Sequence, residues 1–211
     1  MQYADFIIRY LGLQHWILVS NAMHHFNEKR NSNTPDELWL VEHFPIFTEG
    51  KAGKQHNNFI IIDDISIPVL KTDRGGKITY HGPGQLIMYI MIDLKRRKIS
   101  VRQLLTVIQE SVIDTLKHFH IESYVRPNAP GVYIDNNKIC SLGLRIHNGC
   151  SLHGLALNIK MDLSPFGLIY PCGFPDLKMT QLSYFKHDIT VLEVYPILIK
   201  NFLTHCHYNN H

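Results

Sequence analysis

The pattern of apolar residues along the chain predicts a protein that combines strands with helices. Residues 86–92 (LIMYIMI) are continuously apolar, which is typical of a strand buried on both faces. Two later stretches repeat apolar residues at helical spacing, and each begins with the residue pairing of a capping box. We therefore expect one helix to begin at Ser100, with Gln103 three residues on, and the last helix to begin at Thr190, with Glu193 in the same place.

Three shorter segments before residue 75 are predicted as strands. They are rich in apolar residues, are bounded by polar or proline-containing turns, and cover residues 5–10, 37–43 and 67–71. Pro68 cannot donate a ladder hydrogen bond, so we expect residues 67–71 to lie at a sheet edge. Between the first two strands, helical spacing predicts a helix whose single apolar face carries Leu13, Trp16, Ile17, Ser20 and Met23 or His24.

The middle of the chain predicts a β-hairpin. Residues 131–135 and 138–146 flank a turn at Asn136 and Asn137, and asparagine tolerates the positive φ that such turns need. A further strand is expected over residues 151–159. Strands therefore dominate the chain between the two capped helices.

Residues 74–85 (RGGKITYHGPGQ) are the most distinctive stretch, with four glycines directly before the continuous apolar strand. Glycines allow main chain to approach a ligand closely and to present its N–H groups. Arg74 adds a fixed charge and His81 a titratable donor or acceptor. The stretch therefore has two interpretations, a ligand-binding loop and an ordinary tight turn.

Composition limits the classes of protein to consider. A chain of 211 residues with 45% hydrophobic content can bury a sizeable core, and we expect one domain over residues 1–211. A net charge of +3 and a pI near 8.6 do not favour nucleic-acid binding. The sequence shows neither a signal peptide nor a membrane span, so we expect a soluble, cytoplasmic protein that binds no membrane. The basic run 95–98 predicts either a solvated turn or a docking patch for an acidic partner.

The four cysteines lack the C-x-x-C spacing of zinc and redox motifs. Cys140 and Cys206 are expected in the core and Cys150 in an exposed turn, whereas Cys172 stands between prolines and before a glycine, where its sulfur can face a pocket. A structural turn is the alternative for Cys172. No metal site is expected from the tail, because a chain terminus does not preorganise the donors of His205, Cys206, His207 and His211.

A nucleophilic cysteine needs a partner that favours its thiolate. The candidates are Lys138 at the start of a strand, His81 in the glycine-rich stretch and His153 on a later strand. From the residues alone the two histidines rank first, because a hairpin lysine is usually exposed. The spacing along the chain does not decide between them.

Five blocks in order along the chain resemble one known family. They are 37–50 (ELWLVEHFPIFTEG), 74–85 (RGGKITYHGPGQ), 131–146 (GVYIDNNKICSLGLRI), 153–158 (HGLALN) and 170–181 (YPCGFPDLKMTQ). With these blocks the chain resembles the octanoyltransferases of lipoate biosynthesis, also called lipoyl(octanoyl) transferases or lipoate–protein ligase B type enzymes. The ordered set is far more specific than any single block.

The resemblance implies a role for particular residues. Cys172 looks like the nucleophile that holds the acyl group as a thioester, and Lys138 like its activating partner, in place of the histidines. A departure from the family pattern is at Cys140-Ser141, where the family more often has small apolar residues such as alanine. The segments that resemble the acyl and pantetheine site comprise Arg74, Gly75, Gly76, Lys77, Ile78, Thr79, Tyr80, His81, Ser141, Leu142, Gly143, Gly154, Leu155 and Ala156.

The resemblance also implies an α+β fold of the biotin/lipoyl ligase-like kind, a mixed β-sheet flanked by α-helices. The implied reaction transfers an octanoyl group from octanoyl-acyl carrier protein to a lysine of lipoyl domains of 2-oxo acid dehydrogenases or of the glycine-cleavage H protein. Exchange of one thioester for another is close to thermoneutral, so we expect no cofactor and no ATP. The alternatives are an ATP-dependent ligase on the same fold and a binding module without catalysis.

Overall fold

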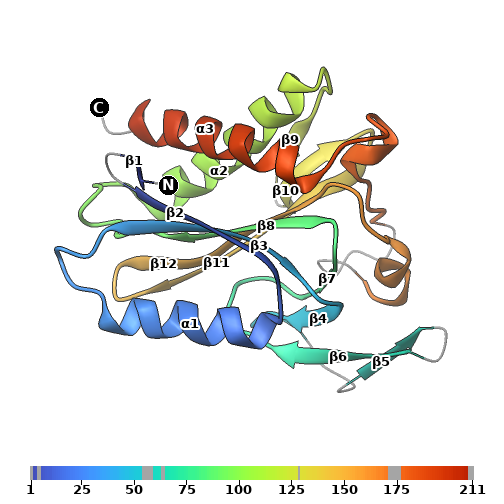
Figure 1. The fold of residues 1–211 in the computed structure, drawn as a ribbon, viewed down its shortest axis with the longest axis horizontal. Helices are drawn as coiled ribbons and strands as arrows, with labels where there is room; N and C mark the ends of the chain where they lie inside the picture. Colours follow the sequence, from blue (N-terminus) through green and yellow to red (C-terminus); the bar gives the residue numbers. More distant parts are fainter. Residues whose placement is uncertain are drawn as a thin grey trace.

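A computed structural model of the protein describes residues 2–3, 6–53, 59–62, 65–127, 129–170 and 177–208. A large mixed sheet runs through its centre, with helices on both faces (Figure 1). Among the strands that these residues form, only β2 and β3 pair in parallel within this sheet. In spatial order its strands are β1 (Gln2–Tyr3), β2 (Phe6–Gln14), β3 (Asp36–His43), β8 (Gln85–Met91), β12 (Cys150–Asn158), β11 (Asn137–His147), β10 (Ala129–Ile134) and β9 (Tyr124–Arg126).

A second, smaller sheet lies on the same side of the molecule as the first helix (Figure 1). Its order is β5 (Phe59–Ile62), β6 (Ile65–Lys71), β4 (Ile46–Glu49) and β7 (Ile78–His81). The helix α1 (Trp16–Lys29) covers one face of the large sheet, and α2 (Val101–His118) and α3 (Val191–Tyr208) cover the other. Two 3₁₀ helices, Ser164–Leu168 and Leu182–Tyr184, complete the described elements.

The continuous apolar run becomes β8, and every residue of that strand is buried. Alternate side chains enter different cores because neighbouring residues of a strand point to opposite faces. Leu86, Met88 and Ile90 pack with residues of α2 and α3, whereas Ile87 and Tyr89 pack with residues of α1. A strand covered on both faces has no need of polar alternation, which explains the sequence pattern.

Both predicted capping boxes are confirmed. The Ser100 hydroxyl accepts from the backbone N–H of Gln103 at 3.2 Å, and the Gln103 side chain accepts from the backbone N–H of Ser100 at 2.8 Å. Thr190 and Glu193 make the same reciprocal bonds at the start of α3. Both helices therefore begin where their sequence signals predict.

Two strand-level predictions are wrong in position. β6 is not an edge strand, because it pairs with β5 through residues up to Pro68 and with β4 from Val69 onward. Pro68 is therefore the last residue of β6 that pairs with β5, and Val69 is the first that pairs with β4. The hairpin turn falls at Asp135 and Asn136, whose φ values are 45° and 71°, one residue earlier than expected.

The first helix begins later than its apolar pattern suggested. β2 continues to Gln14 past a register shift at Gly12, whose φ is +65°, so Leu13 belongs to the strand. The face of α1 that is buried then carries Trp16, Val19, Ser20, Met23 and Asn27, and Ile17 is 46% exposed. The expectation that Leu13 and Ile17 share the buried face is wrong.

The basic run is more than a solvated turn, because two of its residues bind a buried carboxylate. Arg96 Nη2 donates to Asp36 Oδ1 at 2.5 Å and Arg97 Nε donates to Asp36 Oδ2 at 2.6 Å. Asp36 is fully buried and also accepts from Arg30 at 2.7 Å. A buried carboxylate needs such cationic partners, so two of the four basic residues hold the start of β3 in place.

Gly154 is required by the pairing of β12 with β8. A Cβ at this position would overlap the carbonyl oxygen of Met88 across the ladder. We expect Gly154→Ala to lower the free energy of unfolding by roughly 3 kcal/mol, because the strands must separate to admit the methyl group. Gly167→Ala is the matched control, since nothing lies within 4 Å of the place that its methyl group would take, and its unfolding midpoint should barely change. Urea unfolding of both variants checks this, and equal midpoints would refute the packing argument.

Candidate active site

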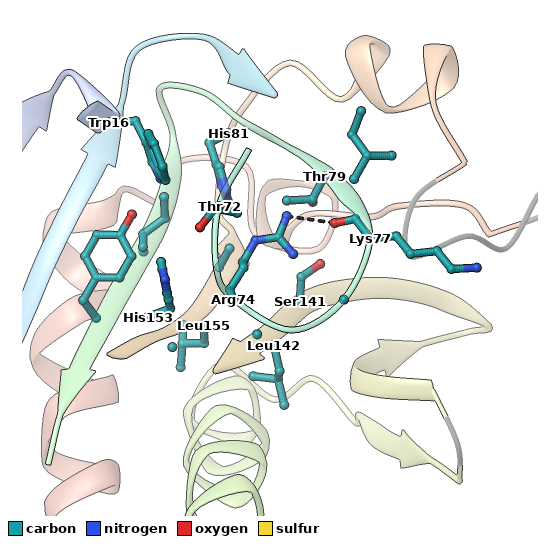
Figure 2. Close-up of a pocket in the computed structure, with 17 residues that line it drawn as sticks. Trp16, Thr72, Arg74, Lys77, Thr79, His81, Ser141, Leu142, His153 and Leu155 are labelled. Carbon is teal, nitrogen blue, oxygen red and sulfur yellow. Dashed lines mark hydrogen bonds between the residues drawn. The ribbon is translucent and has the colours of Figure 1, made fainter. Parts of the chain in front are cut away.

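A cavity opens on the α1 side of the large sheet, beneath the glycine-rich stretch (Figure 2). It encloses about 560 Å³, open space at its mouth included. Strands β8, β11 and β12 form its floor, and residues 72–81 form its cover. Its lining is Trp16, Thr72, Arg74, Gly76, Lys77, Ile78, Thr79, His81, Ile87, Tyr89, Ser141, Leu142, Gly143, His153, Gly154, Leu155 and Ala156.

The structure brings the three predicted substrate segments together around this cavity. All of their residues line it except Gly75 and Tyr80. Gly75 instead ties the cover to the floor, because its N–H donates to the Leu144 carbonyl at 2.9 Å. Tyr80 turns its ring away from the cavity to pack against Phe47 and Phe166, and burial raises the pKa of its phenol to about 12.

Sequence reasoning did not assign four of the lining residues to a site. Ile87 and Tyr89 were expected only as core of the continuous apolar strand, and Trp16 only as part of a helix face. Thr72 carried no signal at all. Alternation along β8 was the available clue for Ile87 and Tyr89, since their face of the strand is the one on which the cavity lies.

Arg74 holds the cover closed rather than simply offering a charge to solvent. Its Nη2 donates to the Thr48 carbonyl at 2.7 Å and to the Lys77 carbonyl at 2.9 Å (Figure 2). Its Nη1 donates to the Gly75 carbonyl at 3.0 Å. A guanidinium presents several donors in one plane, so a single side chain can bind carbonyls from β4 and from the glycine-rich stretch.

The bonds of His81 fix its tautomer. The Gln85 amide nitrogen donates to Asn158 Oδ1 at 2.9 Å, so the Gln85 oxygen is the acceptor that faces His81 Nδ1 at 2.7 Å. His81 Nδ1 therefore carries the proton, and Nε2 accepts from the Thr48 hydroxyl at 3.0 Å. Burial, with the nearby His43, lowers the pKa of His81 to about 3, which keeps the ring neutral.

Asn158 extends this chain of bonds to the end of the molecule that contains the fifth sequence block. Its amide nitrogen donates to the Thr180 carbonyl at 3.0 Å, and both residues are buried. Thr48, His81, Gln85, Asn158 and Thr180 therefore belong to one hydrogen-bonded network. The network joins four of the blocks that carried the resemblance, and it explains why polar residues recur there inside a core.

Lys138 is 1% exposed, so it is not the solvent-exposed lysine that is usual in a hairpin. Its Nζ donates to the Pro130 carbonyl at 3.1 Å and lies 5.3 Å from the centroid of the Tyr133 ring. Gly131 makes room for it, because a Cβ there would come within 2.9 Å of Lys138 Cε. Lys138 lies in β11 three residues before Ser141, and Ser141 lines the cavity.

Residues 178–180 run beside Lys138. Lys138 N–H donates to the Lys178 carbonyl and Thr180 N–H donates to the Lys138 carbonyl, both at 2.9 Å. Cys172 itself, the predicted nucleophile, lies outside the described residues. Of the other cysteines, Cys140 and Cys206 are buried as expected, but Cys150 is also buried, and the prediction that it is exposed is wrong.

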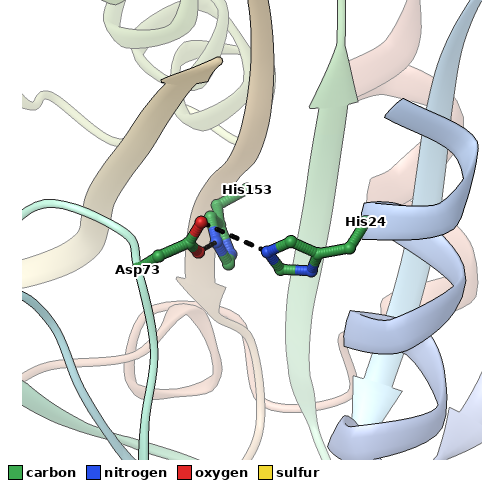
Figure 3. A group of neighbouring side chains, drawn as sticks. All are labelled: His24, Asp73 and His153. Carbon is green, nitrogen blue, oxygen red and sulfur yellow. Dashed lines mark hydrogen bonds and ion pairs between the residues drawn. The ribbon is translucent and has the colours of Figure 1, made fainter. Parts of the chain in front are cut away.

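His153 reaches the site through an unusual backbone conformation. Alternation along β12 assigns position 153 to the α2 and α3 side, since Leu152 packs towards α1 and Leu155 away from it. The φ of His153 is +61°, however, and its Nε2 donates to Asp73 Oδ1 at 2.7 Å (Figure 3). A strained backbone of this kind marks a position held by its surroundings.

Asp73, the residue directly before Arg74, contacts three basic or titratable side chains. Besides His153, it contacts His24 Nε2 at 3.2 Å and Arg145 Nε at 3.7 Å. Its hydrogen bond with His153 holds the pKa of the Asp73 carboxyl well below its usual range. Burial lowers the pKa of His153, so this ring donates as the neutral imidazole, whereas bonds to Ser20 and Asp73 outweigh burial and raise the pKa of His24.

This cluster and the chain terminus are the places where a metal would be sought. Donor atoms of His24, Asp73 and His153 all lie within 4.8 Å of one another. At the terminus, His205 Nε2 instead contacts Asp114 at 2.8 Å.

Among the described residues, no helix is both long enough and apolar enough to cross a membrane.

Comparison with known proteins identifies the fold and the family. Solved structures with the same fold include a lipoate-protein ligase A bound with ATP (TM-score 0.79, 14% identity, covering 96% of this chain and 86% of that one). They also include the biotin protein ligase from Aquifex aeolicus in complex with biotin and ATP (TM-score 0.58, 14% identity, 99% and 72%). The profile of the lipoyl protein ligase A/B catalytic domain matches residues 17–203. The chain therefore belongs to the lipoyl protein ligase A/B catalytic-domain family, and the expected α+β fold is confirmed.

Closer relatives place the chain within that family. It is 56% identical over 202 residues to the octanoyltransferases of Yersinia pseudotuberculosis serotype O:1b (strain IP 31758) and Yersinia pestis (strain Pestoides F). In both cases the match covers 96% of this chain and 85% of the relative. The activity is accordingly octanoyl transfer in protein lipoylation, and the enzyme is an acyltransferase of lipoate biosynthesis.

Acid is expected to destabilise this site between about pH 6.5 and pH 4. Burial lowers the pKa of His43 to about 4 and that of His81 to about 3, whereas both rings protonate near the usual value of about 6.5 when the chain unfolds. In this range the unfolded state binds more protons than the folded state. Each unit by which the pH is lowered therefore reduces the free energy of unfolding by about 1.4 kcal/mol for each ring. Urea titrations at several pH values should show a smaller slope for His81→Gln than for the wild type. An identical slope would mean that His81 is not held neutral.

Proposed function

We propose that Cys172 carries the octanoyl group as a thioester between two protein substrates. The donor is octanoyl-acyl carrier protein, and the acceptors are lysines of lipoyl domains of 2-oxo acid dehydrogenases and of the glycine-cleavage H protein. The reaction takes place in the cytoplasm, on a catalytic domain that spans residues 1–211. The observation that supports this proposal best is the burial of Lys138 beside the segment that follows Cys172.

Two described groups around Lys138 suit an ammonium group. The Pro130 carbonyl accepts a hydrogen bond from Nζ, and the face of the Tyr133 ring attracts a cation. An ammonium group close to a thiol stabilises the thiolate, which is the nucleophilic form. Lys138 therefore acts first as the electrostatic partner of Cys172, and it can later take the proton that the acceptor lysine must lose.

The cavity fits the two parts of an acyl-pantetheine thioester. Apolar side chains of Ile87 and Ala156 suit a hydrocarbon chain, and polar groups of Arg74, Lys77 and the glycine pair suit the amide-rich pantetheine arm. In the first step the Cys172 sulfur attacks the carrier's thioester carbonyl and the pantetheine thiolate leaves. In the second, the acceptor amine attacks the enzyme thioester, an amide forms and Cys172 is released. Thioester to amide is downhill, so neither step needs ATP or another cofactor.

Intact mass spectrometry after mixing with octanoyl-acyl carrier protein tests the thioester. We expect an octanoyl adduct on the wild type without ATP, no adduct on Cys172→Ala, and an adduct on Cys140→Ala, which removes the buried thiol two residues after Lys138 in the chain. An adduct that persists in Cys172→Ala would refute the assignment of the nucleophile. Transfer that requires ATP and proceeds without a cysteine adduct would instead indicate the ligase chemistry of the wider family.

Replacement of Lys138 tests its electrostatic role. Lys138→Met keeps the shape of the side chain but removes the charge, so the thiol should return towards its ordinary pKa of about 8.5 and only a few per cent would be thiolate at neutral pH. We expect adduct formation to slow roughly 30-fold near pH 7 and to recover as the pH rises above about 8.5. A rate that is unchanged near pH 7 would contradict the proposed role.

A further inference from the structure

A second hollow lies next to the proposed acyl cavity and is separated from it by Trp16. This hollow is an open groove of about 640 Å³, and the residues that it does not share with the cavity are polar or charged: Ser20, His24, Lys51, Lys71 and Asp73. Trp16 and Thr72 line both spaces. Because Trp16 is much the larger of the two, its indole is the main partition between the cavity and the groove.

The indole is buried, and hydrogen bonds fix Tyr89, which lines the same cavity. His43 Nδ1 donates to the Gln14 carbonyl at 3.0 Å, and since a carbonyl only accepts, His43 Nε2 is left to accept from the Tyr89 hydroxyl at 2.8 Å. Trp16, Tyr89 and His43 are each at most 6% exposed. The partition is therefore a rigid wall.

The position of the wall matches the far end of a bound acyl chain. Figure 2 shows Trp16 and Lys77 on opposite sides of the cavity, with Arg74 between them. The polar side is continuous with β11, the strand of Lys138, where the thioester carbonyl would lie under the proposed function. Ile87 and Tyr89 form part of the apolar floor of the cavity. A chain attached at the polar side therefore points its methyl end towards the indole.

We propose that Trp16 sets the length of the acyl group that the enzyme accepts, by closing the cavity behind the methyl end of an eight-carbon chain. This inference rests on the proposed function. Removal of the indole joins the cavity to the groove and gives additional methylenes a place to lie. Each methylene that leaves water improves binding about fourfold, so a small increase in reach changes selectivity measurably.

The test compares acyl chains of different length on wild type and Trp16→Ala. Octanoyl-, decanoyl- and dodecanoyl-acyl carrier proteins compete for the enzyme, and mass spectrometry measures the ratio of adducts. We expect the decanoyl-to-octanoyl ratio to rise roughly tenfold in Trp16→Ala, because two more methylenes become buried. The ratio should change less than about threefold in Trp16→Phe, which retains a ring as the wall. Equal ratios in wild type and a folded Trp16→Ala would overturn the proposal.

Trp39 provides the matched control. It is the other tryptophan of the chain, is 7% exposed, and packs in the α1-facing core without lining the cavity. Trp39→Ala should therefore lose stability, as Trp16→Ala does, and keep the wild-type ratio of adducts. A shift of similar size in Trp39→Ala would show that a loosened core, and not the loss of the wall, changes the selectivity.

A binding experiment separates failure of this inference from failure of the proposed function. If no protein forms an adduct with any carrier, the thioester mechanism is wrong, but the cavity is still tested by calorimetric titration with octanoate and decanoate. The ratio of their dissociation constants should again shift in favour of decanoate by roughly tenfold in Trp16→Ala. An unchanged ratio in that experiment would overturn the role of Trp16 by itself.

Discussion

The site depends on a buried chain of hydrogen bonds whose directions are all determined. It begins at the guanidinium of Arg74, passes through the Thr48 hydroxyl, the neutral ring of His81 and the Gln85 amide, and reaches Asn158, which donates to the Thr180 carbonyl. Each member must donate to the next, so reversing one amide or protonating one ring would leave buried polar atoms unpaired. This requirement sets the position of the glycine-rich cover relative to both the sheet and the segment after Cys172.

Around this network the sheet changes from core to binding surface within a few residues. β8 is buried along its whole length, yet Ile87 and Tyr89 form part of the cavity floor, and their partners across the ladder on β12 are the small residues Ala156 and Gly154. At Gly143 a Cβ would come within 3.2 Å of Arg74 Cδ, so a side chain there would press against the cover. The cavity thus exists where side chains are missing, and its apolar character comes from a strand that is otherwise core.

Charged residues contribute more to the architecture than their place in the sequence suggested. Asp36 gathers Arg30, Arg96 and Arg97, and Asp73 gathers His24 and His153. In both cases a single carboxylate joins segments that are far apart in the chain. The first cluster fixes the start of β3, and the second fixes the residue before Arg74, so both stabilise the frame on which the hydrogen-bonded network depends.

The sequence by itself determined the elements whose signals are local. Capping boxes located the starts of two helices, the continuous apolar run identified the central strand, and the ordered blocks identified the family. Tertiary structure decided what depends on contacts between distant segments. Lys138 is buried only because β10 and residues 178–180 enclose β11, His153 faces α1 only because of its positive φ, and Trp16 is a wall only because α1 lies against the cavity. Local sequence patterns do not predict such contacts. The burial and direction of these side chains are set by segments that are distant in the chain and not by the neighbouring residues.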